Sequence, residues 1–226
     1  MQKVKYIFFT LSLALVFSLN ACSSTAQNGN GSTNTPQKKE NLDLSQFHKA
    51  YFASGCFWCV EAVFESVEGV AEAISGYSGG KEPNPTYRMI GTGTTGHAEA
   101  VEVYYDSTKV DFPTLVKVFF GSQDPTTPNR QGPDRGPQYR SIAFYQNATE
   151  KASIEAYVEE LEASGVYSAP IVTEVTAFEK FWIAEDYHQD YERLHPEQPY
   201  IKAVSIPRLN RFQEKFPELL KKDARH

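Results

Sequence analysis

The stretch Gly55-Cys56-Phe57-Trp58-Cys59 places two cysteines at the start of a predicted helix. Apolar residues follow at helical spacing, and Gly69 ends their pattern; they are Val60, Val63, Phe64 and Val67. The first turn of a helix has unpaired backbone N–H groups and the positive end of the helix dipole, which favour thiolate over thiol. We therefore predict that Cys56 is a nucleophile. Because it lies nearest the helix end, its thiolate form should be stabilised most. Cys59 is predicted to be its neighbour in disulfide exchange.

Two other interpretations of the cysteine pair stay open at this point. Buried cysteines are common core residues, so the pair could be structural. The pair could also be half of a zinc site, but such a site needs about four ligands. No second Cys/His pair with finger spacing follows in the chain. We therefore expect no metal.

A carboxylate lies on the apolar face of a predicted strand. Because side chains alternate along a strand, one face carries Glu99, Val101, Val103 and Tyr105. A buried, unpaired carboxylate is costly and keeps its proton to higher pH, as a general acid must. A carboxylate at the strand end that reaches water or a salt bridge is an equally open alternative. The pattern makes Glu99 a candidate acid.

Composition limits the classes of function. The chain has 226 residues, of which 41% are hydrophobic, and a net charge of −6. This length allows one sizeable domain or two small ones. The acidic balance argues against general nucleic-acid binding. Three cysteines are too few for a disulfide-framed scaffold.

The N-terminal residues are typical of a secretory signal, which indicates that the protein is exported from the cytoplasm. Lys3 and Lys5 precede an apolar run of signal-peptide length, which is too short to be read as a membrane span. The run ends in Leu19-Asn20-Ala21-Cys22, which resembles a bacterial lipobox and implies lipidation of Cys22; an ordinary cleaved signal is the alternative. We expect a signal peptide at residues 1–21, a flexible tether at residues 22–46 and the catalytic domain at residues 47–226. The protein would then be anchored to a bacterial membrane in the cell envelope, outside the cytoplasm.

Strands and helices are mixed along the domain. The pattern predicts helices from Cys56, from Asp111, over 148–163, over 184–193 and at the C-terminus, where Leu209, Phe212, Phe216 and Leu219 share a face. It predicts strands over 50–53, 70–75, 98–105, 141–145 and 171–177, with a glycine-rich turn at 76–80. This order predicts an α+β fold, with one mixed sheet and helices packed on it.

A long loop is predicted between the second and third of these helices. Residues 121–140 contain four prolines and three glycines. A loop of this length inside a compact domain is often functional. The loop carries five residues whose side chains could take part in binding or catalysis: Asp124, Arg130, Asp134, Arg135 and Tyr139.

Several short sequence strings, taken together, resemble those of the A-type peptide-methionine sulfoxide reductases. The resemblance runs from about Ala50 to about Lys221. No single string is specific to that family, but the order in which they occur is specific. The matching strings are Gly55-Cys56-Phe57-Trp58, Ser75-Gly76-Tyr77 with Gly79-Gly80, Asn84-Pro85-Thr86-Tyr87, Gly96-His97-Ala98-Glu99, Gln131-Gly132 with Asp134, Gln138-Tyr139-Arg140-Ser141 and Ala184-Glu185-Asp186-Tyr187-His188-Gln189.

The resemblance implies a two-layer α/β plait with a ferredoxin-like core, and it implies roles. Cys56 looks like the catalytic nucleophile and Glu99 like the acid that protonates the sulfoxide oxygen. Phe57 and Trp58 look like the pocket for the substrate methyl group. The remaining implied site residues are Tyr87 and Tyr139 as hydroxyl donors, Asp134 as an organising polar group, and Tyr187, His188 and Tyr191 as part of the wall.

The implied activity is reduction of methionine-S-sulfoxide, in proteins, peptides or free form, to methionine. Cys56 would become a sulfenic acid. Many relatives have Gly where this chain has Cys59, and nothing after Cys59 is Cys. Cys59 is therefore expected to form a disulfide with Cys56, reduced by a thioredoxin-like protein; a one-cysteine cycle with an outside thiol stays open. We expect a monomer that needs no cofactor beyond this external reductant.

Two functions from other classes compete with this interpretation. A general disulfide oxidoreductase would explain the two cysteines but would leave Glu99, Tyr87 and Tyr139 without a role. A lipid-anchored binding protein could hold methionine-like ligands in the aromatic pocket without turnover. The joined motifs favour the reductase over both.

Overall fold

The structure is a computed structural model that describes residues 42–224. The predicted signal peptide, Cys22 and the tether up to residue 41 lie outside the described residues. Within the described part, residues 44–46 form a short 3-10 helix, η1 (Leu44–Gln46), just before the first strand. No helix among the described residues has both the length and the apolar character needed to cross a membrane.

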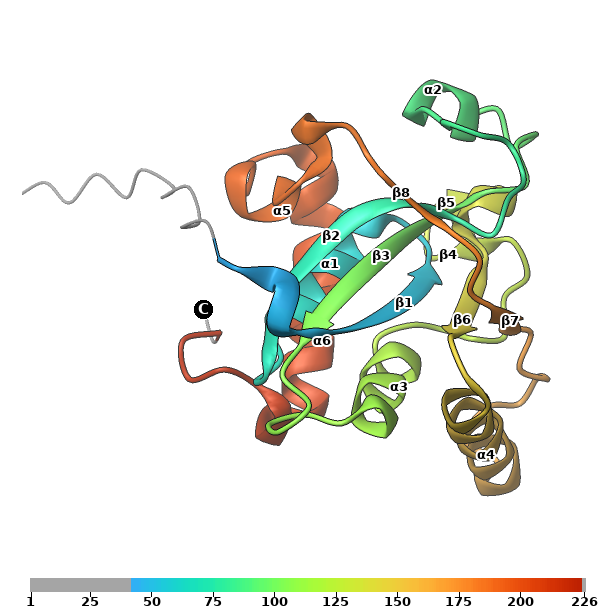
Figure 1. Cartoon of the computed structure of the whole chain (residues 1–226), viewed down its shortest axis with the longest axis vertical. Helices are drawn as coiled ribbons and strands as arrows, with labels where there is room; N and C mark the ends of the chain where they lie inside the picture. Colours follow the sequence, from blue (N-terminus) through green and yellow to red (C-terminus); the bar gives the residue numbers. More distant parts are fainter. Residues whose placement is uncertain (1–41, 225–226) are drawn as a thin grey trace, which may run out of the picture. The chain divides into compact units, whose positions relative to one another are not determined.

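A curled, mixed sheet of six strands forms the centre of the α+β fold (Figure 1). Its order is β7-β6-β1-β3-β2-β8; all neighbours are antiparallel except β6 and β7, which are parallel. The strands are β1 (His48–Ser54), β2 (Val70–Ser78), β3 (Ala98–Tyr105), β6 (Ser141–Tyr145), β7 (Glu174–Ala177) and β8 (Phe181–Ile183). A separate two-stranded hairpin is formed by β4 (Arg130–Gln131) and β5 (Asp134–Arg135).

Helices and short helical turns connect these strands. The α-helices are α1 (Phe57–Glu65), α2 (Tyr87–Ile90), α3 (Phe112–Gly121), α4 (Ala148–Ser164), α5 (Tyr191–Leu194) and α6 (Ile206–Lys215). The 3-10 turns are η2 (Pro137–Tyr139), η3 (Asp186–His188) and η5 (Pro217–Leu219), and a π-helical turn η4 (Ile201–Ser205) leads into α6.

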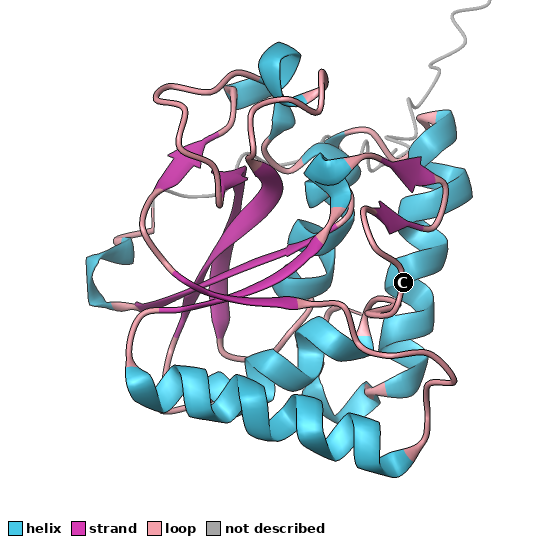
Figure 2. Ribbon diagram, turned by 90° about the vertical axis from the view of Figure 1, so that its right-hand side faces the viewer, coloured by secondary structure: helices cyan, strands magenta, loops and turns pink. Residues whose placement is uncertain are grey.

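The two faces of the sheet are covered differently. The main core joins one face of the sheet to α1, α3 and α6 through buried residues such as Phe52, Phe64, Phe119 and Phe212. The other face has a smaller apolar cluster, on which Phe178 and residues near it pack. In Figure 1 the connection from β7 to β8 crosses in front of the sheet, while α1 and α6 lie behind it; Figure 2 shows the strands from the side, with helices packed beside them. Helices therefore cover one face of the sheet, and the connection near Phe178 covers part of the other face.

The predicted strand β1 and helix α1 are confirmed, and they position the first cysteine. β1 runs buried in the middle of the sheet, between β6 and β3. The chain turns at Gly55, whose φ of 80° is left-handed, and α1 starts directly after Cys56. A side chain at position 55 would also collide with Gln131, since its Cβ would lie 2.5 Å from that residue's Cβ. This tight turn brings the cysteine to the end of the central strands.

The prediction of a turn at 76–80 is wrong for its first residues, because β2 continues to Ser78. Gly76 pairs with β3 on one side and with β8 on the other, so its backbone is fully used in the sheet. A Cβ on Gly76 would lie 2.3 Å from the ring of Phe181. The glycine therefore allows β8 to approach closely, a tertiary cause that a local pattern cannot show.

The C-terminal predictions also need correction. The predicted helix over 184–193 is interrupted: η3 and α5 are separate, and Asp190 between them has a φ of 55°. The Gln189 side chain bonds the backbone of Ser75 at both its oxygen and its nitrogen, at 2.9 and 3.0 Å, which fixes the break. The last predicted strand is shorter, starting at Glu174, and α6 ends at Lys215, before Leu219.

Candidate active site

Cys56 and Glu99 meet at the N-terminus of α1. Cys56 is the N-cap of this helix, and its side chain makes no capping hydrogen bond. The next backbone N–H, of Phe57, donates to Oε2 of Glu99 at 3.1 Å. Glu99 comes from the first part of β3 and is only 2% exposed. The predicted burial of the carboxyl is thus confirmed, and the carboxyl lies at the helix end that begins with the cysteine.

Burial is the main influence on the Glu99 carboxyl. It raises the pKa of Glu99 to about 8, against the opposing effect of the Phe57 N–H; the charge of Asp134 also raises it. At neutral pH Glu99 is therefore protonated and can donate its proton. This is the protonation state that a general acid requires.

Burial and neighbouring groups act differently on the pKa values of the two thiols. Burial raises the pKa of the Cys56 thiol. A hydrogen bond from Cys56 lowers the pKa of Cys59 to about 6, and the charge of Arg208 acts in the same direction. Burial therefore opposes the effect of the helix end at Cys56, which lies at the cap.

A cluster of aromatic side chains surrounds the start of α1 and would form the wall of the predicted pocket. Trp58 stacks on Tyr191 with ring centroids 3.9 Å apart and planes 10° apart. His188 lies between the rings of Phe57 and Tyr87, at 4.9 and 4.3 Å. His188 is 2% exposed, and burial lowers its pKa, so its ring is neutral. The pocket is apolar and suits a small uncharged group.

Unpaired polar atoms face this aromatic cluster. Among the described residues, neither ring nitrogen of His188 has a hydrogen-bond partner, and the same holds for the indole nitrogen of Trp58. Buried polar groups are normally paired, so unpaired ones point to a ligand or a functional need. These atoms are candidates to contact a bound substrate.

Hydroxyl groups from two loops reach the same site. Tyr87 starts α2, and Tyr139 ends η2 in the long loop. Burial raises the pKa of Tyr87 to about 12 and that of Tyr139 further, and in both cases the charges of Glu99 and Cys56 add to the effect. Both phenols therefore keep their protons at neutral pH and are available as donors.

Asp134 is held by a residue that the sequence did not indicate. The hydroxyl of Tyr200 donates to Oδ2 of Asp134 at 2.5 Å and lies 3.9 Å from the sulfur of Cys59. Tyr200 also meets the edge of Trp58, with centroids 6.1 Å apart. It lies outside every matching string and outside any periodic segment, so only the folded chain shows it. Glu185 was likewise missed: it accepts from the Tyr87 N–H and from the Tyr77 hydroxyl.

The structure brings most of the predicted site residues into one place. Those that converge on the end of α1 are Cys56, Phe57, Trp58, Cys59, Tyr87, Glu99, Asp134, Tyr139, His188 and Tyr191. Tyr187 is 61% exposed and touches His188 from outside, so it belongs to the rim rather than to the wall.

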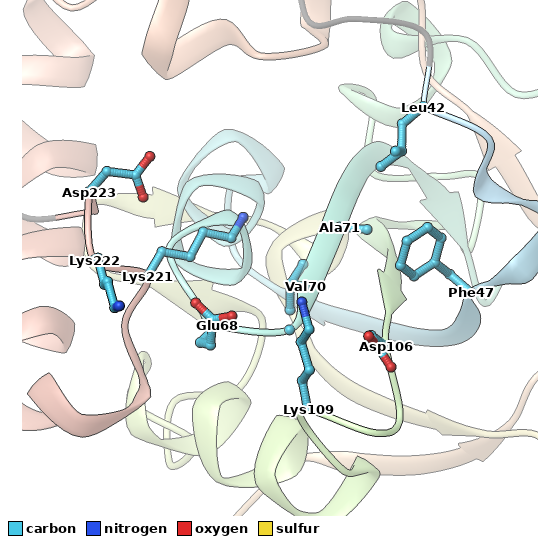
Figure 3. A pocket seen from close by; sticks show the side chains of 11 residues that line it. Leu42, Phe47, Glu68, Val70, Ala71, Asp106, Lys109, Lys221, Lys222 and Asp223 are labelled. Atoms are coloured by element: carbon cyan, nitrogen blue, oxygen red, sulfur yellow. The ribbon is translucent and has the colours of Figure 1, made fainter.

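A hollow of about 600 Å³ lies elsewhere, at the other ends of β2 and β3 (Figure 3). Val70 and Ala71 form its floor, and the charged residues of both signs around it include Lys109, Asp106 and Glu68. None of the candidate active-site residues lines this hollow, and its lining does not indicate a class of ligand.

The described residues hold one group of carboxylates close enough for a metal ion, Glu61, Glu65 and Asp190. Both oxygens of Glu61 already accept hydrogen bonds, from the Ser75 hydroxyl and the Asp190 N–H. Burial raises the pKa of Glu61 well above its usual value, which disfavours the charged carboxylate that a cation would bind. The group is better explained as packing between α1 and the α5 region.

The site thus combines a thiol pair, a protonated carboxyl, phenol donors and an apolar pocket. Such a combination defines a thiol-dependent oxidoreductase whose substrate has an oxygen to be protonated. Comparison with known proteins gives the family. The family model described as peptide methionine sulfoxide reductase matches residues 48–220, and the chain belongs to this family of enzymes, which reduce methionine sulfoxide.

Relatives match most of the domain. The peptide methionine sulfoxide reductase MsrA 1 of Rhodopirellula baltica is 48% identical over 172 residues, 76% of this chain and 88% of the relative. MsrA of Thermus thermophilus is 45% identical over 172 residues, 76% and 97% of the two chains. Among solved structures, methionine sulfoxide reductase A of Corynebacterium diphtheriae has a TM-score of 0.62 at 34% identity, covering 72% of this chain and 84% of that one.

Proposed function

We propose that Cys56 reduces methionine-S-sulfoxide, with Glu99 as the proton donor and Cys59 as the resolving thiol. The observation that carries this proposal is the hydrogen bond between the Glu99 carboxyl and the N–H of Phe57, next to Cys56. It places a buried, protonated acid beside the nucleophile. A sulfoxide oxygen leaves poorly until it is protonated, so this pairing fits the reaction.

In the first step the Cys56 sulfur attacks the substrate sulfur while Glu99 gives its proton to the sulfoxide oxygen. As Cys56 attacks, its own proton moves to the neighbouring Cys59, whose pKa is the lower of the two. The Cys56 sulfur bonds to the substrate sulfur, and the protonated oxygen leaves that sulfur as hydroxide. The hydroxide then bonds to Cys56 while the new sulfur–sulfur bond breaks, so methionine leaves and Cys56 remains as a sulfenic acid. The substrate gains two electrons and Cys56 loses two. Tyr87 and Tyr139 donate to the oxygen while charge develops on it.

The aromatic pocket would select the substrate. Phe57, Trp58 and Tyr87 offer an apolar surface to the methyl group, and His188 and Tyr191 complete the wall. Because such a pocket is chiral, only one sulfoxide epimer would place its oxygen at the carboxyl and its methyl group at the rings. We assign the S epimer, and we expect proteins, peptides and free methionine sulfoxide as substrates.

In the second step Cys59 attacks the sulfur of the Cys56 sulfenic acid. A sulfur–sulfur bond forms, the sulfur–oxygen bond breaks, and the oxygen leaves as water after taking a proton. A thioredoxin-like dithiol then reduces the disulfide. Both thiols are buried and interact directly, which supports this route over a one-cysteine cycle. No cofactor takes part in these steps.

Mass spectrometry after one equivalent of methionine sulfoxide tests the proposal. The wild-type protein is expected to lose two hydrogens between Cys56 and Cys59 as the sulfoxide is consumed. Cys59→Ser is expected to complete the first turnover, to gain one oxygen on Cys56, and to lose at least about tenfold in steady turnover with thioredoxin. Undiminished steady turnover in Cys59→Ser would show that Cys59 is not the resolving thiol.

The fold has a finer description that belongs to the same proposal. The segment β1–α1–β2–β3–α3–β6 has its strands in the order β6-β1-β3-β2, all antiparallel. This strand order supports a ferredoxin-like plait as the core, to which β7, β8 and the long loops would be additions. We propose that this plait, acting as a monomer, is the catalytic unit.

We further propose that the domain is exported and anchored by a lipid on Cys22. The support is the sequence Leu19-Asn20-Ala21-Cys22 after an apolar run, followed by a polar tether that ends where the fold begins. Metabolic labelling with radioactive palmitate in a bacterial host is expected to mark the wild-type protein and to be lost in Cys22→Ala. Equal labelling of the two proteins would refute the anchor.

A further inference from the structure

The hydroxyl of Tyr200 contacts two groups of the site, and the reaction above gives it no role. Its oxygen lies 3.9 Å from the sulfur of Cys59, and it donates to Oδ2 of Asp134 at 2.5 Å. Tyr200 is the residue just before η4, so it approaches α1 from the C-terminal segment. Its ring packs edge-on against Trp58, with planes 74° apart. Tyr200 therefore connects the second thiol to a carboxylate in the long loop.

The direction of these contacts follows from the chemistry of a phenol. A phenol hydroxyl has one proton to donate, and its oxygen can also accept. Because the proton of Tyr200 is directed to Asp134, its oxygen faces Cys59 as an acceptor. A neutral Cys59 thiol is then the donor, and a chain runs from Cys59 through Tyr200 to Asp134. Along such a chain each proton can move one step in the same direction while the heavy atoms stay in place.

The second half of the reaction needs a way to remove a proton from Cys59. In the proposed first step Cys59 takes up the proton of Cys56. That step also removes the thiol hydrogen of Cys56, whose hydrogen bond lowers the pKa of Cys59 before the reaction. Cys59 is only 2% exposed, so bulk water does not reach it freely. A protein group in contact with its sulfur is therefore needed to take the proton as Cys59 attacks.

Asp134 suits the far end of this chain. It lies in the short strand β5 and is half-buried, so its carboxylate meets the Tyr200 hydroxyl on the protein side and can still exchange protons with solvent. Burial raises the pKa of Asp134 above its ordinary value, against the opposing effect of the Tyr200 hydroxyl. A carboxylate with a raised pKa is a better proton acceptor.

We propose that Tyr200 is a catalytic residue of the second step, which relays the proton of Cys59 to Asp134 while Cys59 attacks the sulfenic acid. The Cys59 proton moves to the Tyr200 oxygen as the Tyr200 proton moves to Asp134. The Cys59 sulfur supplies the electron pair of the new sulfur–sulfur bond, and the sulfur–oxygen bond of Cys56 breaks. The leaving oxygen keeps that electron pair, takes a proton from solvent and becomes water. Asp134 then returns its proton to solvent. The relay rests on the proposed resolving role of Cys59.

Tyr200→Phe tests the relay, because it removes the hydroxyl and keeps the ring against Trp58. After one equivalent of methionine sulfoxide, rapid quenching and mass spectrometry follow methionine, the Cys56 sulfenic acid and the Cys56–Cys59 disulfide over time. The variant is expected to form methionine but to convert the sulfenic acid to the disulfide about 10²-fold more slowly, so that the sulfenic acid accumulates. Conversion as fast as in the wild type would overturn the relay.

A matched control lies in β1. Tyr51 is a buried tyrosine whose hydroxyl also donates to a carboxylate, that of Glu102, at 2.8 Å. Tyr51→Phe therefore makes the same chemical change away from the thiols. It is expected to leave both methionine formation and conversion of the sulfenic acid unchanged. A loss equal to that of Tyr200→Phe would mean that any buried hydroxyl has this effect, and would overturn the relay.

Asp134→Asn tests the other end of the chain. The amide oxygen can still accept from Tyr200 but cannot take up its proton, so conversion of the sulfenic acid should slow by a similar factor. Because both substitutions break one chain, the double variant with Tyr200→Phe should be no slower than either single variant. Losses that multiply in the double variant would show two independent effects and overturn the relay. If Tyr200→Phe does not fold, unchanged conversion in Asp134→Asn would overturn it instead.

The same measurement separates the relay from the proposed function. A wild-type protein that forms methionine and keeps the sulfenic acid, with no disulfide, would refute the resolving role of Cys59 and the relay with it. A disulfide that forms equally fast in the wild type and in Tyr200→Phe would refute the relay alone and leave Cys59 as the resolving thiol.

Discussion

Replacing Cys56 by serine is expected to abolish sulfoxide reduction, with a loss of more than about 10⁴-fold in the first turnover. A serine oxygen that attacked the substrate sulfur would have to leave as a hydroperoxide, which is not a feasible product. The binding pocket of Phe57, Trp58 and His188 would remain. Single-turnover measurement of methionine formed from methionine sulfoxide gives the result directly.

The same variant should not lose stability, and this makes it informative. Cys56 is the N-cap of α1 without a side-chain capping bond, and serine is a preferred residue at that position. We expect the thermal midpoint of Cys56→Ser to be equal to or above that of the wild type. Cys59→Ser is the matched comparison, since it removes the neighbouring thiol and the acceptor of the Cys56 proton, and it should slow the first turnover without abolishing it. Methionine formation by Cys56→Ser would contradict the assignment of the nucleophile.

Much of the site could be predicted because its parts lie close to recognisable local patterns. The signals that predict α1 all lie in the segment from Gly55 to Gly69: its start, its helical periodicity and the glycine that ends it. The alternation that predicts burial of Glu99 lies within β3. What local patterns could not give is how these segments meet. The resemblance to a family supplied that step, and the Phe57–Glu99 hydrogen bond confirms that α1 and β3 meet there.

The features that were missed depend on contacts between distant segments. Tyr200 and Arg208 follow the cysteines by more than a hundred residues, and their neighbours in the chain show no pattern that assigns a role. The surroundings of the two thiols depend on such contacts too. The helix dipole acts from α1 alone, whereas Arg208 and Tyr200 act on Cys59 from the C-terminal segment, and burial acts on Cys56. Local electrostatics were outweighed by tertiary ones.

The interrupted segment 184–193 shows the same competition in the backbone. Its composition suits a helix, but Gln189 bonds the edge of β2, and Glu185 bonds the Tyr87 N–H. These tertiary bonds hold His188 against Phe57 and Tyr87. A continuous helix would not place the Gln189 and His188 side chains in these positions together. The departure from local preference is therefore found where the site needs it.

Glu99→Gln is expected to lower the first-turnover rate by about 10²–10⁴-fold, the usual contribution of a general acid. The amide has nearly the same shape, and its oxygen can still accept from the Phe57 N–H, so the end of α1 should keep its structure. What is lost is the transferable proton. An unchanged single-turnover rate would remove Glu99 from the mechanism.

A matched control lies on the same strand. Glu102 is also buried, but its carboxylate accepts from the hydroxyls of Tyr51 and Tyr104 and from Lys49, away from the cysteines. Glu102→Gln makes the same chemical change and is expected to leave the first-turnover rate unchanged. A similar loss in both variants would mean that the effect comes from the strand and not from the acid.

The pH dependence of the first turnover separates loss of the acid from loss of binding. Glu99 has a pKa of about 8, raised from its ordinary value, so the reactive acid is present below pH 8 and is lost as the pH rises through it. Cys59 has a pKa of about 6, so the thiol pair loses its first proton as the pH rises through 6. The wild-type rate should therefore be greatest between these limits and fall on both sides. In Glu99→Gln the alkaline fall should disappear while the acid fall stays, because only the carboxyl has been removed.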